Sequence, residues 1–143
     1  MGYLSGSRLD EPERLVAKVS DMVEVKAPPE LSILIPVRNE TLNLRIMIRI
    51  INAALRCSHE ILVIYDDPED DSIAVIEESK REFNNVAKVF NDNGVGVANA
   101  IRAGVESANG GRVLIFAADE VGPVLAVEDM MALMDEGSEF VSC

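Results

Sequence analysis

Five short apolar segments, rich in β-branched residues and separated by longer stretches of helical periodicity, constrain the fold of this chain most strongly. They cover residues 31–37, 60–66, 86–92, 112–119 and 139–143. Strands that are apolar on both faces and alternate with helices are typical of a parallel sheet covered on both sides. We therefore predict an α/β fold in which a doubly wound, mainly parallel sheet carries helices on both faces, joined by right-handed crossovers.

The chain length of 143 residues, of which 48% are hydrophobic, suits one ordinary domain. Residues 1–30 form a predicted extension with a short helix, because Leu15, Val19 and Met22 follow helical spacing. The domain itself is predicted to span residues 31–143. Since nothing follows the last apolar segment to cover the sheet, we expect this domain to be incomplete at its C-terminus.

The charge of the chain limits its ligands. Lys and Arg number 13, Asp and Glu number 25, and the formal net charge is -12, which disfavours generic binding to nucleic acid or to an anionic membrane surface. Any phosphate group of a ligand must then be bound by backbone N–H groups, by a few arginines or by a metal cation. No apolar run approaches the roughly 18 residues of a spanning helix. The first residues lack the apolar centre of a signal peptide, so we expect a cytoplasmic location. The composition leaves homo-oligomerisation open.

The first crossover helix carries a polar stripe on an otherwise apolar surface. This stripe consists of Arg45, Arg49, Asn52 and Arg56. The narrow arc that these residues share predicts a solvated face on a largely buried helix.

Ligands of open α/β sheets bind beyond the carboxyl ends of the strands. Four such ends lie in residues 36–40, 65–72, 91–99 and 117–123. We therefore look for a functional site in these four loops.

The second loop is strongly acidic. Asp70 or Asp71 is well placed to cap the next helix, with Pro68 fixing the turn. Asp66 and Asp67 repel each other unless a partner neutralises or hydrogen-bonds them, and the donor groups of a nucleobase or ribose would suit. A solvated loop explains these residues equally well.

The third loop is a glycine-rich turn that opens a helix. Gly94 and Gly96 bring backbone N–H groups close to a phosphate in such turns. The alternative is close helix packing, which small residues allow. The residues concerned are Ala98, Ala100, Ala103 and Gly104.

The fourth loop has two interpretations. Asp119 can cap a helix that begins near Pro123, because proline is expected in a first helical turn. Alternatively, Asp119 and Glu120 can supply oxygen ligands to a hard divalent cation, together with the phosphates of a nucleotide.

Taken together and in order, the four loops resemble the nucleotide-binding half of an inverting family-2 glycosyltransferase of the GT-A fold, which is Rossmann-like. The resemblance covers residues 31–143 and is strongest to polyprenyl-phosphate mannosyl- and glucosyltransferases. The stretches that carry it are ILIPVRNETLNL (33–44), EILVIYDDPEDDS (60–72), VFNDNGVGVANAIRAG (89–104) and GGRVLIFAADEVGPV (110–124).

The resemblance implies a site for a GDP- or UDP-linked sugar. The residues that would contact the nucleotide sugar are Pro36, Val37, Arg38, Glu40, Asp66, Asp67, Gly94, Gly96, Ala118 and Asp119. It also implies Mg²⁺ or Mn²⁺ at the position of an Asp-x-Asp pattern, here held by Asp119 and Glu120. The acceptor would be a lipid phosphate or a saccharide, and the full-length protein would act at the cytoplasmic face of a membrane.

The sequence departs from the family pattern at this corner. Ala117 occupies the first acidic position of Asp-x-Asp, Glu120 replaces an apolar residue, and Pro68 replaces a glycine. The resemblance also puts the acceptor-binding residues and the catalytic base beyond Cys143, so this chain alone is expected to bind a donor without turnover.

Two alternatives remain. Aspartates at several strand ends also suit a receiver-like signalling module that binds Mg²⁺ beside a phosphorylatable carboxylate. Ala117, in turn, suits an inactive glycosyltransferase relative.

Overall fold

Four parallel strands form one sheet in the order β3–β2–β1–β4 in the computed structural model, which describes residues 27–143. The elements are β1 (Leu31–Pro36), α2 (Thr41–Ala54), β2 (His59–Tyr65), α3 (Ser72–Glu82), β3 (Val86–Phe90), α4 (Val97–Ser107), β4 (Arg112–Ile115), the 3₁₀ helix η1 (Gly122–Ala126) and α5 (Val127–Asp135). The predicted α/β fold with a parallel sheet is confirmed. The short helix expected within residues 1–30 lies outside the described residues.

Register along the central strand aligns the apolar segments. Ile33 of β1 lies opposite Ile61 of β2 on one side and opposite Leu114 of β4 on the other. β4 is shorter than the predicted segment 112–119, because the chain leaves the sheet after Phe116, whose N–H donates to the carbonyl of Leu34 at 2.9 Å.

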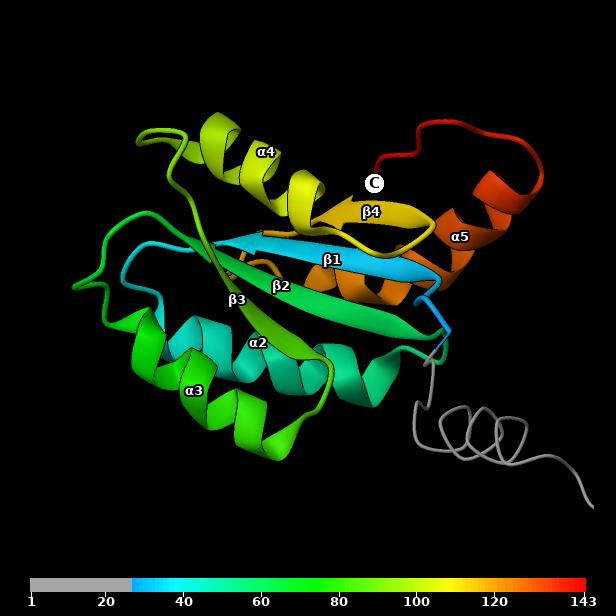
Figure 1. Ribbon diagram of the computed structural model, residues 1–143. Helices are drawn as coiled ribbons and strands as arrows, with labels where there is room; N and C mark the ends of the chain where they lie inside the picture. Colours follow the sequence, from blue (N-terminus) through cyan, green and yellow to red (C-terminus); the bar gives the residue numbers. More distant parts are fainter. Residues whose placement is uncertain (1–26) are drawn as a thin grey trace, which may run out of the picture.

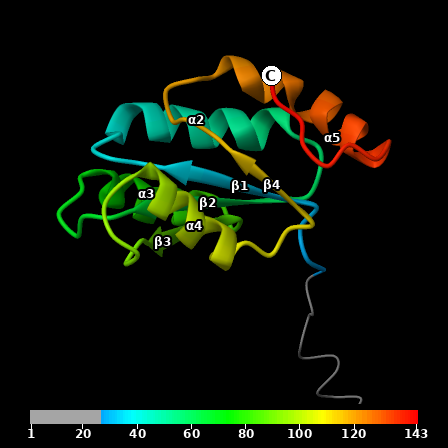
Figure 2. The same cartoon turned by 90° about the horizontal axis from the view of Figure 1, so that it is seen from above.

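One face of the sheet is covered by α2, α3, η1 and α5. Figure 1 shows α2 and α3 below the sheet, and Figure 2 shows α5 beside α2. The buried residues of α2 recur at the three- and four-residue spacing of an apolar helix stripe. They are Leu44, Met47, Ile48 and Ile51, and they form one core with Ile33, Ile35, Ile61, Val63, Ile76, Val124 and Val127.

The helix on the other face is α4, which packs against β1, β2 and β3 (Figure 1). Close approach depends on small residues: a Cβ at Gly104 would lie 3.0 Å from side-chain carbons of both Leu34 and Ile64. α4 covers little of β4, whose side chains Val113 and Ile115 on this face stay 40% and 54% exposed.

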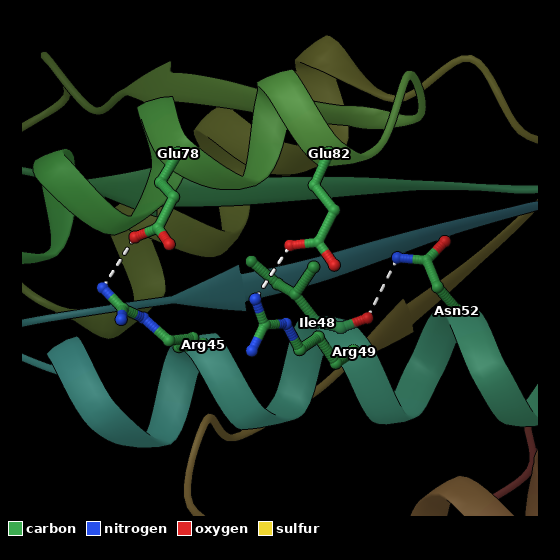
Figure 3. Close-up of polar contacts among 6 residues, drawn as sticks. All are labelled: Arg45, Ile48, Arg49, Asn52, Glu78 and Glu82. Carbon is green, nitrogen blue, oxygen red and sulfur yellow. Dashed lines mark hydrogen bonds and ion pairs between the residues drawn. The ribbon is translucent and has the colours of Figure 1, made fainter.

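The polar stripe of α2 is solvated, as predicted, and it also contacts the neighbouring helix α3. Arg45 pairs with Glu78 of α3 at 2.7 Å, and Arg49 pairs with Glu82 at 3.0 Å (Figure 3). Asn52 donates to a main-chain carbonyl of its own helix. Exposed ion pairs of this kind contribute about 0–1 kcal/mol each. The stripe therefore connects α2 to α3 at the surface but adds little to the stability of the fold.

The prediction of a strand at residues 139–143 is wrong. These residues are irregular and lie against β4 and α5, where Phe140 and Val141 line an apolar cavity with Ile115. A short apolar run cannot be assigned to strand by periodicity alone. Here the run borders the cavity with most of its side chains exposed, Phe140 at 85%, and the strand pairs of the described residues involve β1 to β4 alone. In residues 27–143, no helix is long and apolar enough to cross a bilayer.

A carboxylate clamp joins the amino ends of the strands. Glu60 of β2 accepts the Ser32 hydroxyl at 2.6 Å and the Asn109 backbone N–H at 2.7 Å, while Gly110 donates its N–H to the Ser32 hydroxyl at 2.8 Å. Burial alone would raise the pKa of the Glu60 carboxyl, but the hydrogen bonds from Ser32 and Asn109 outweigh it and lower the net pKa. The clamp therefore favours the ionised carboxylate.

The clamp predicts a pH-dependent stability. The pKa of Glu60 is lower in the folded chain than in the unfolded chain, where it is about 4.3. The ionised carboxylate therefore contributes fully to the free energy of unfolding above that unfolded pKa, and this contribution is lost as the pH falls through the native pKa. We expect Glu60→Gln to reduce the free energy of unfolding at pH 7 by about 1–2 kcal/mol, with a smaller difference below about pH 4. Urea unfolding at several pH values measures this. Glu106→Gln, an exposed change on α4, is the control, and a Glu60→Gln deficit that does not vary with pH would contradict the assignment.

Candidate functional site

The strand order creates a crevice at the carboxyl ends of β1 and β4. The chain steps from β1 to β2 to β3 in one direction and then returns to the other side of β1 to form β4. Such a topological switch point is where open α/β sheets bind ligands. The receiver-like alternative is wrong, because receivers order their strands 2-1-3-4-5, with β3 beside β1, whereas here β3 lies beside β2.

A cavity of about 330 Å³ occupies this crevice, which falls within the range of about 300–1,000 Å³ typical of small-molecule sites. It brings together eight of the predicted site residues: Pro36, Val37, Arg38, Glu40, Asp66, Gly96, Ala118 and Asp119. Ala117 also lines it. The predicted residues Asp67, Gly94 and Glu120 do not line this cavity.

The β1 loop presents Arg38 and Glu40 to the cavity. Arg38 is exposed and Glu40 is half-buried. Between them, Asn39 has a φ of 55°, in the left-handed region that asparagine tolerates better than most residues. The loop is tied to the start of α3 by two hydrogen bonds from its main chain, to Asp70 and to Ser72.

The two adjacent aspartates of the β2 loop have different surroundings. Asp66 is half-buried, lines the cavity, and accepts the N–H of Gly96 at 3.3 Å. Asp67 is exposed and accepts the N–H of Glu69 at 2.9 Å, which closes a local turn. The geometry thus gives Asp66 a place in the site, whereas Asp67 stabilises its own loop.

Buried Asn91 organises the glycine turn. Its side chain donates to the carbonyl of Gly94 at 2.8 Å and accepts the N–H of Asn93 at 3.0 Å. Gly94 and Gly96 have φ values of 104° and 117°, which other residues rarely adopt. The turn leads into α4, whose first turn has no side-chain cap. Its amino end therefore offers backbone N–H groups beside the cavity.

Asp119 and Glu120 face different cavities. Residues 117–120 form a turn in which the Glu120 N–H donates to the Ala117 carbonyl at 3.3 Å. Asp119 lines the crevice, whereas Glu120 lines the apolar cavity between β4 and α5. The helix-cap interpretation of Asp119 is wrong, because η1 begins at Gly122 with Val121 before it.

The donor set fits a cation that is shared with a ligand. No group of three or more metal-ligating side chains occurs in residues 27–143, so the protein offers no closed metal cage there. Mg²⁺ usually takes one or two carboxylates together with substrate phosphates and water. Asp119 is an exposed carboxylate at the cavity wall, with Asp66 lining the same cavity, and this arrangement suits such a shared cation.

The apolar cavity beside β4 is of similar volume, about 330 Å³, but its chemistry differs. Methionines and aliphatic side chains dominate its lining, among them Val113, Ile115, Met130, Met131 and Met134. Few polar groups converge there, so the crevice at the strand ends remains the candidate site.

Sequence reasoning missed three apolar residues of the crevice, Ile64, Val97 and Ala100. It also missed that Asp70, expected only as a helix cap, contacts the β1 loop. One signal was available for Val97, which directly follows the glycine turn. No local pattern could reveal a contact between residues 31 positions apart.

Comparison with known proteins agrees with this geometry. Residues 32–143 match the sequence profile described as glycosyl transferase family 2. The chain is 31% identical over 124 residues to undecaprenyl-phosphate 4-deoxy-4-formamido-L-arabinose transferase of Enterobacter sp. (strain 638). The match covers 84% of this chain and 38% of that relative, so the chain spans well under half of the relative's length.

Solved structures share the fold at low sequence identity. A mannosyltransferase from Pyrobaculum calidifontis, PcManGT, in complex with GDP-Man and Mn²⁺ superposes with a TM-score of 0.61 at 17% identity, over 82% of this chain and 37% of that one. S. aureus TarS 1-349 in complex with UDP-GlcNAc superposes with a TM-score of 0.57 at 18% identity, over 75% of this chain and 31% of that one.

Proposed function

The chain belongs to glycosyl transferase family 2, and from this premise we propose that the crevice at the carboxyl ends of its strands binds the nucleoside diphosphate of a sugar nucleotide. The observation that carries the proposal is that residues from four separate loops line the same cavity. Four loops, each predicted separately from the sequence, contribute predicted site residues to one cavity at the topological switch point.

The base and ribose are assigned to the side of the crevice nearest β1 and β2. Asp66 supplies a carboxylate that can accept ribose hydroxyls or base N–H groups, and Glu40 supplies a second one. Ile64 and Val97 give apolar walls against which a base can pack. Asp67, which binds its own loop, is assigned no direct contact.

The diphosphate is assigned to the side of the crevice between α4 and Asp119. The uncapped amino end of α4 offers N–H groups and the positive end of the helix dipole. Arg38 adds a guanidinium from the β1 loop. Because the chain is acidic overall, a phosphate needs these local positive groups.

Mg²⁺ or Mn²⁺ completes this assignment, with Asp119 as its protein ligand and Asp66 lining the same cavity. When bound, the cation neutralises the negative charge that a diphosphate leaving group develops as the glycosidic bond breaks. PcManGT, a structural neighbour, was solved with GDP-Man and Mn²⁺. Glu120 is assigned no metal contact because it lines the other cavity.

We propose further that the whole protein transfers a hexose-type sugar to a lipid-phosphate acceptor at the cytoplasmic face of a membrane. The similarity to an undecaprenyl-phosphate transferase supports this acceptor class over a saccharide. An inactive relative that binds nucleotide is the second candidate, favoured by Ala117, which lines the crevice where the family pattern has an acidic residue.

Calorimetric titration with GDP, UDP, GDP-mannose and UDP-N-acetylglucosamine tests the proposal. We expect either the two guanosine ligands or the two uridine ligands to bind in the presence of Mn²⁺. Their affinity should fall at least about tenfold, which corresponds to about 1.4 kcal/mol, when EDTA removes the metal. Adenosine diphosphate serves as the base control. If none of these ligands binds with or without metal, the proposed function is wrong for this chain.

A further inference from the structure

Asp70 is the only charged side chain that is buried in the part of the chain that the structure describes, with 4% of its surface exposed. Burying a carboxylate is costly unless hydrogen bonds replace its water. No lysine or arginine pairs with it among the described residues. The charge must therefore be stabilised by other donors.

Main-chain N–H groups of two separate loops supply these donors. The Asn39 N–H lies 3.2 Å and 3.1 Å from the two Asp70 carboxylate oxygens. The Ser72 N–H, at the start of α3, donates to Asp70 Oδ1 at 2.8 Å. In parallel, Glu40 donates its N–H to the Ser72 hydroxyl at 2.8 Å. Asp70 and Ser72 thus join the β1 loop to α3 through adjacent peptide groups.

The peptide groups held in this way carry the crevice side chains. Asn39 lies between Arg38 and Glu40 in the chain, and the side chains of these two residues line the crevice. Asp70 itself does not line the crevice. Asn39 also has a φ of 55°, a conformation that persists only where the surroundings favour it. Loss of the Asp70 contact would release this peptide group and let the two flanking side chains move.

We propose that Asp70 is a positioning residue for the nucleotide site: it fixes the Asn39 peptide and thereby the places of Arg38 and Glu40. The proposal rests on the function assigned to the crevice above. It differs from a helix-capping role because the cap uses the Ser72 N–H, whereas positioning uses the Asn39 N–H.

Asp70→Ser separates these two roles. Serine is nearly as good as aspartate at capping a helix start, so the contact to Ser72 survives. Its shorter side chain has one oxygen in place of two and loses the paired contact to Asn39. Asp71→Ser is the matched control, because Asp71 is exposed, directly precedes α3 and makes no side-chain capping bond.

Three measurements on the whole chain test the proposal: amide hydrogen exchange of Asn39 by NMR, calorimetric affinity for GDP or UDP with Mn²⁺, and the thermal midpoint. For Asp70→Ser we expect at least tenfold faster exchange at Asn39 and about tenfold weaker nucleotide binding, since hydrogen bonds to charged groups are comparatively strong. Because the Asn39 N–H loses its acceptor, the thermal midpoint of Asp70→Ser should fall by a few degrees while the chain stays folded. The Asp71→Ser control should stay close to the parent in all three measurements.

Unchanged nucleotide affinity in Asp70→Ser despite faster exchange at Asn39 would overturn the positioning role. If Asp70→Ser fails to fold, Asp70→Asn provides the test, because the amide keeps the shape of the carboxylate but leaves a single acceptor oxygen for the Asn39 and Ser72 N–H groups; unchanged affinity there would also overturn the proposal. A parent chain that binds no nucleotide would instead refute the proposed function, and the Asn39 exchange rates would still report whether Asp70 holds the loop.

Discussion

Replacing Asp119 by asparagine is expected to weaken metal-dependent nucleotide binding by at least about a hundredfold, since even outer-shell partners of a metal change its affinity by about 10–100-fold. The reason is electrostatic. Asp119 is the exposed carboxylate at the crevice corner assigned to the diphosphate, and a neutral amide oxygen cannot offset the charge of a divalent cation. Calorimetry with the nucleotide that binds the parent chain, with Mn²⁺ and with EDTA, measures the loss.

Glu120→Gln is the matched control for this experiment. Glu120 is the adjacent residue and is exposed to solvent, as Asp119 is, but its side chain lines the apolar cavity. The substitution removes the same negative charge as Asp119→Asn. We expect its nucleotide affinity to equal that of the parent chain. Equal losses in the two variants would mean that overall charge, and not a ligand at the crevice, governs binding. Undiminished binding by Asp119→Asn would remove Asp119 from the site.

Gly110→Ala is expected to reduce the free energy of unfolding by about 3 kcal/mol, the upper part of the usual range for overpacking a core. A Cβ at this position would lie 2.6 Å from the backbone N of Ser32, 2.7 Å from its hydroxyl and 2.8 Å from the carbonyl carbon of Leu31. These atoms belong mainly to the main chain of central strand β1, which pairs on both sides and cannot move aside. Urea unfolding followed by circular dichroism measures the change.

Gly111→Ala controls for the loss of glycine in the same loop. The nearest atom to its added Cβ is the Glu30 carbonyl oxygen at 3.8 Å, an ordinary contact. We expect a change within about 0.5 kcal/mol of the parent, as for most surface substitutions. Similar losses at both positions would show that chain flexibility, not the approach of Gly110 to β1, sets the stability of this loop.

Local patterns predicted the layered fold well. Each of the segments 31–37, 60–66, 86–92 and 112–119 coincides with a strand of the sheet to within a few residues at its ends, because β-branched runs too short for a helix favour extended backbone. The same criterion failed at residues 139–143. Whether a short apolar run pairs as a strand depends on the neighbours that are available to it, and those are set by the tertiary structure.

The site was predicted in part for a related reason. Strand ends can be located from the sequence, and the carboxyl ends of parallel strands share one edge of the sheet, so residues such as Asp66 and Asp119 were expected to converge. The sequence could not separate Asp119 from Glu120. Consecutive residues in a turn point in different directions, and the backbone angles that decide this depend on how the turn packs.

The sequence by itself determined which residues form strands and helices, the acidic character of the chain and the four loops that carry polar groups, because these follow from periodicity and composition within short windows. The tertiary structure alone decided the strand order, the crevice beside β1, the separation of Asp119 from Glu120, and the contact of buried Asp70 with the Asn39 peptide. Each of these depends on residues far apart in the chain, which come together only when apolar side chains are buried between the layers.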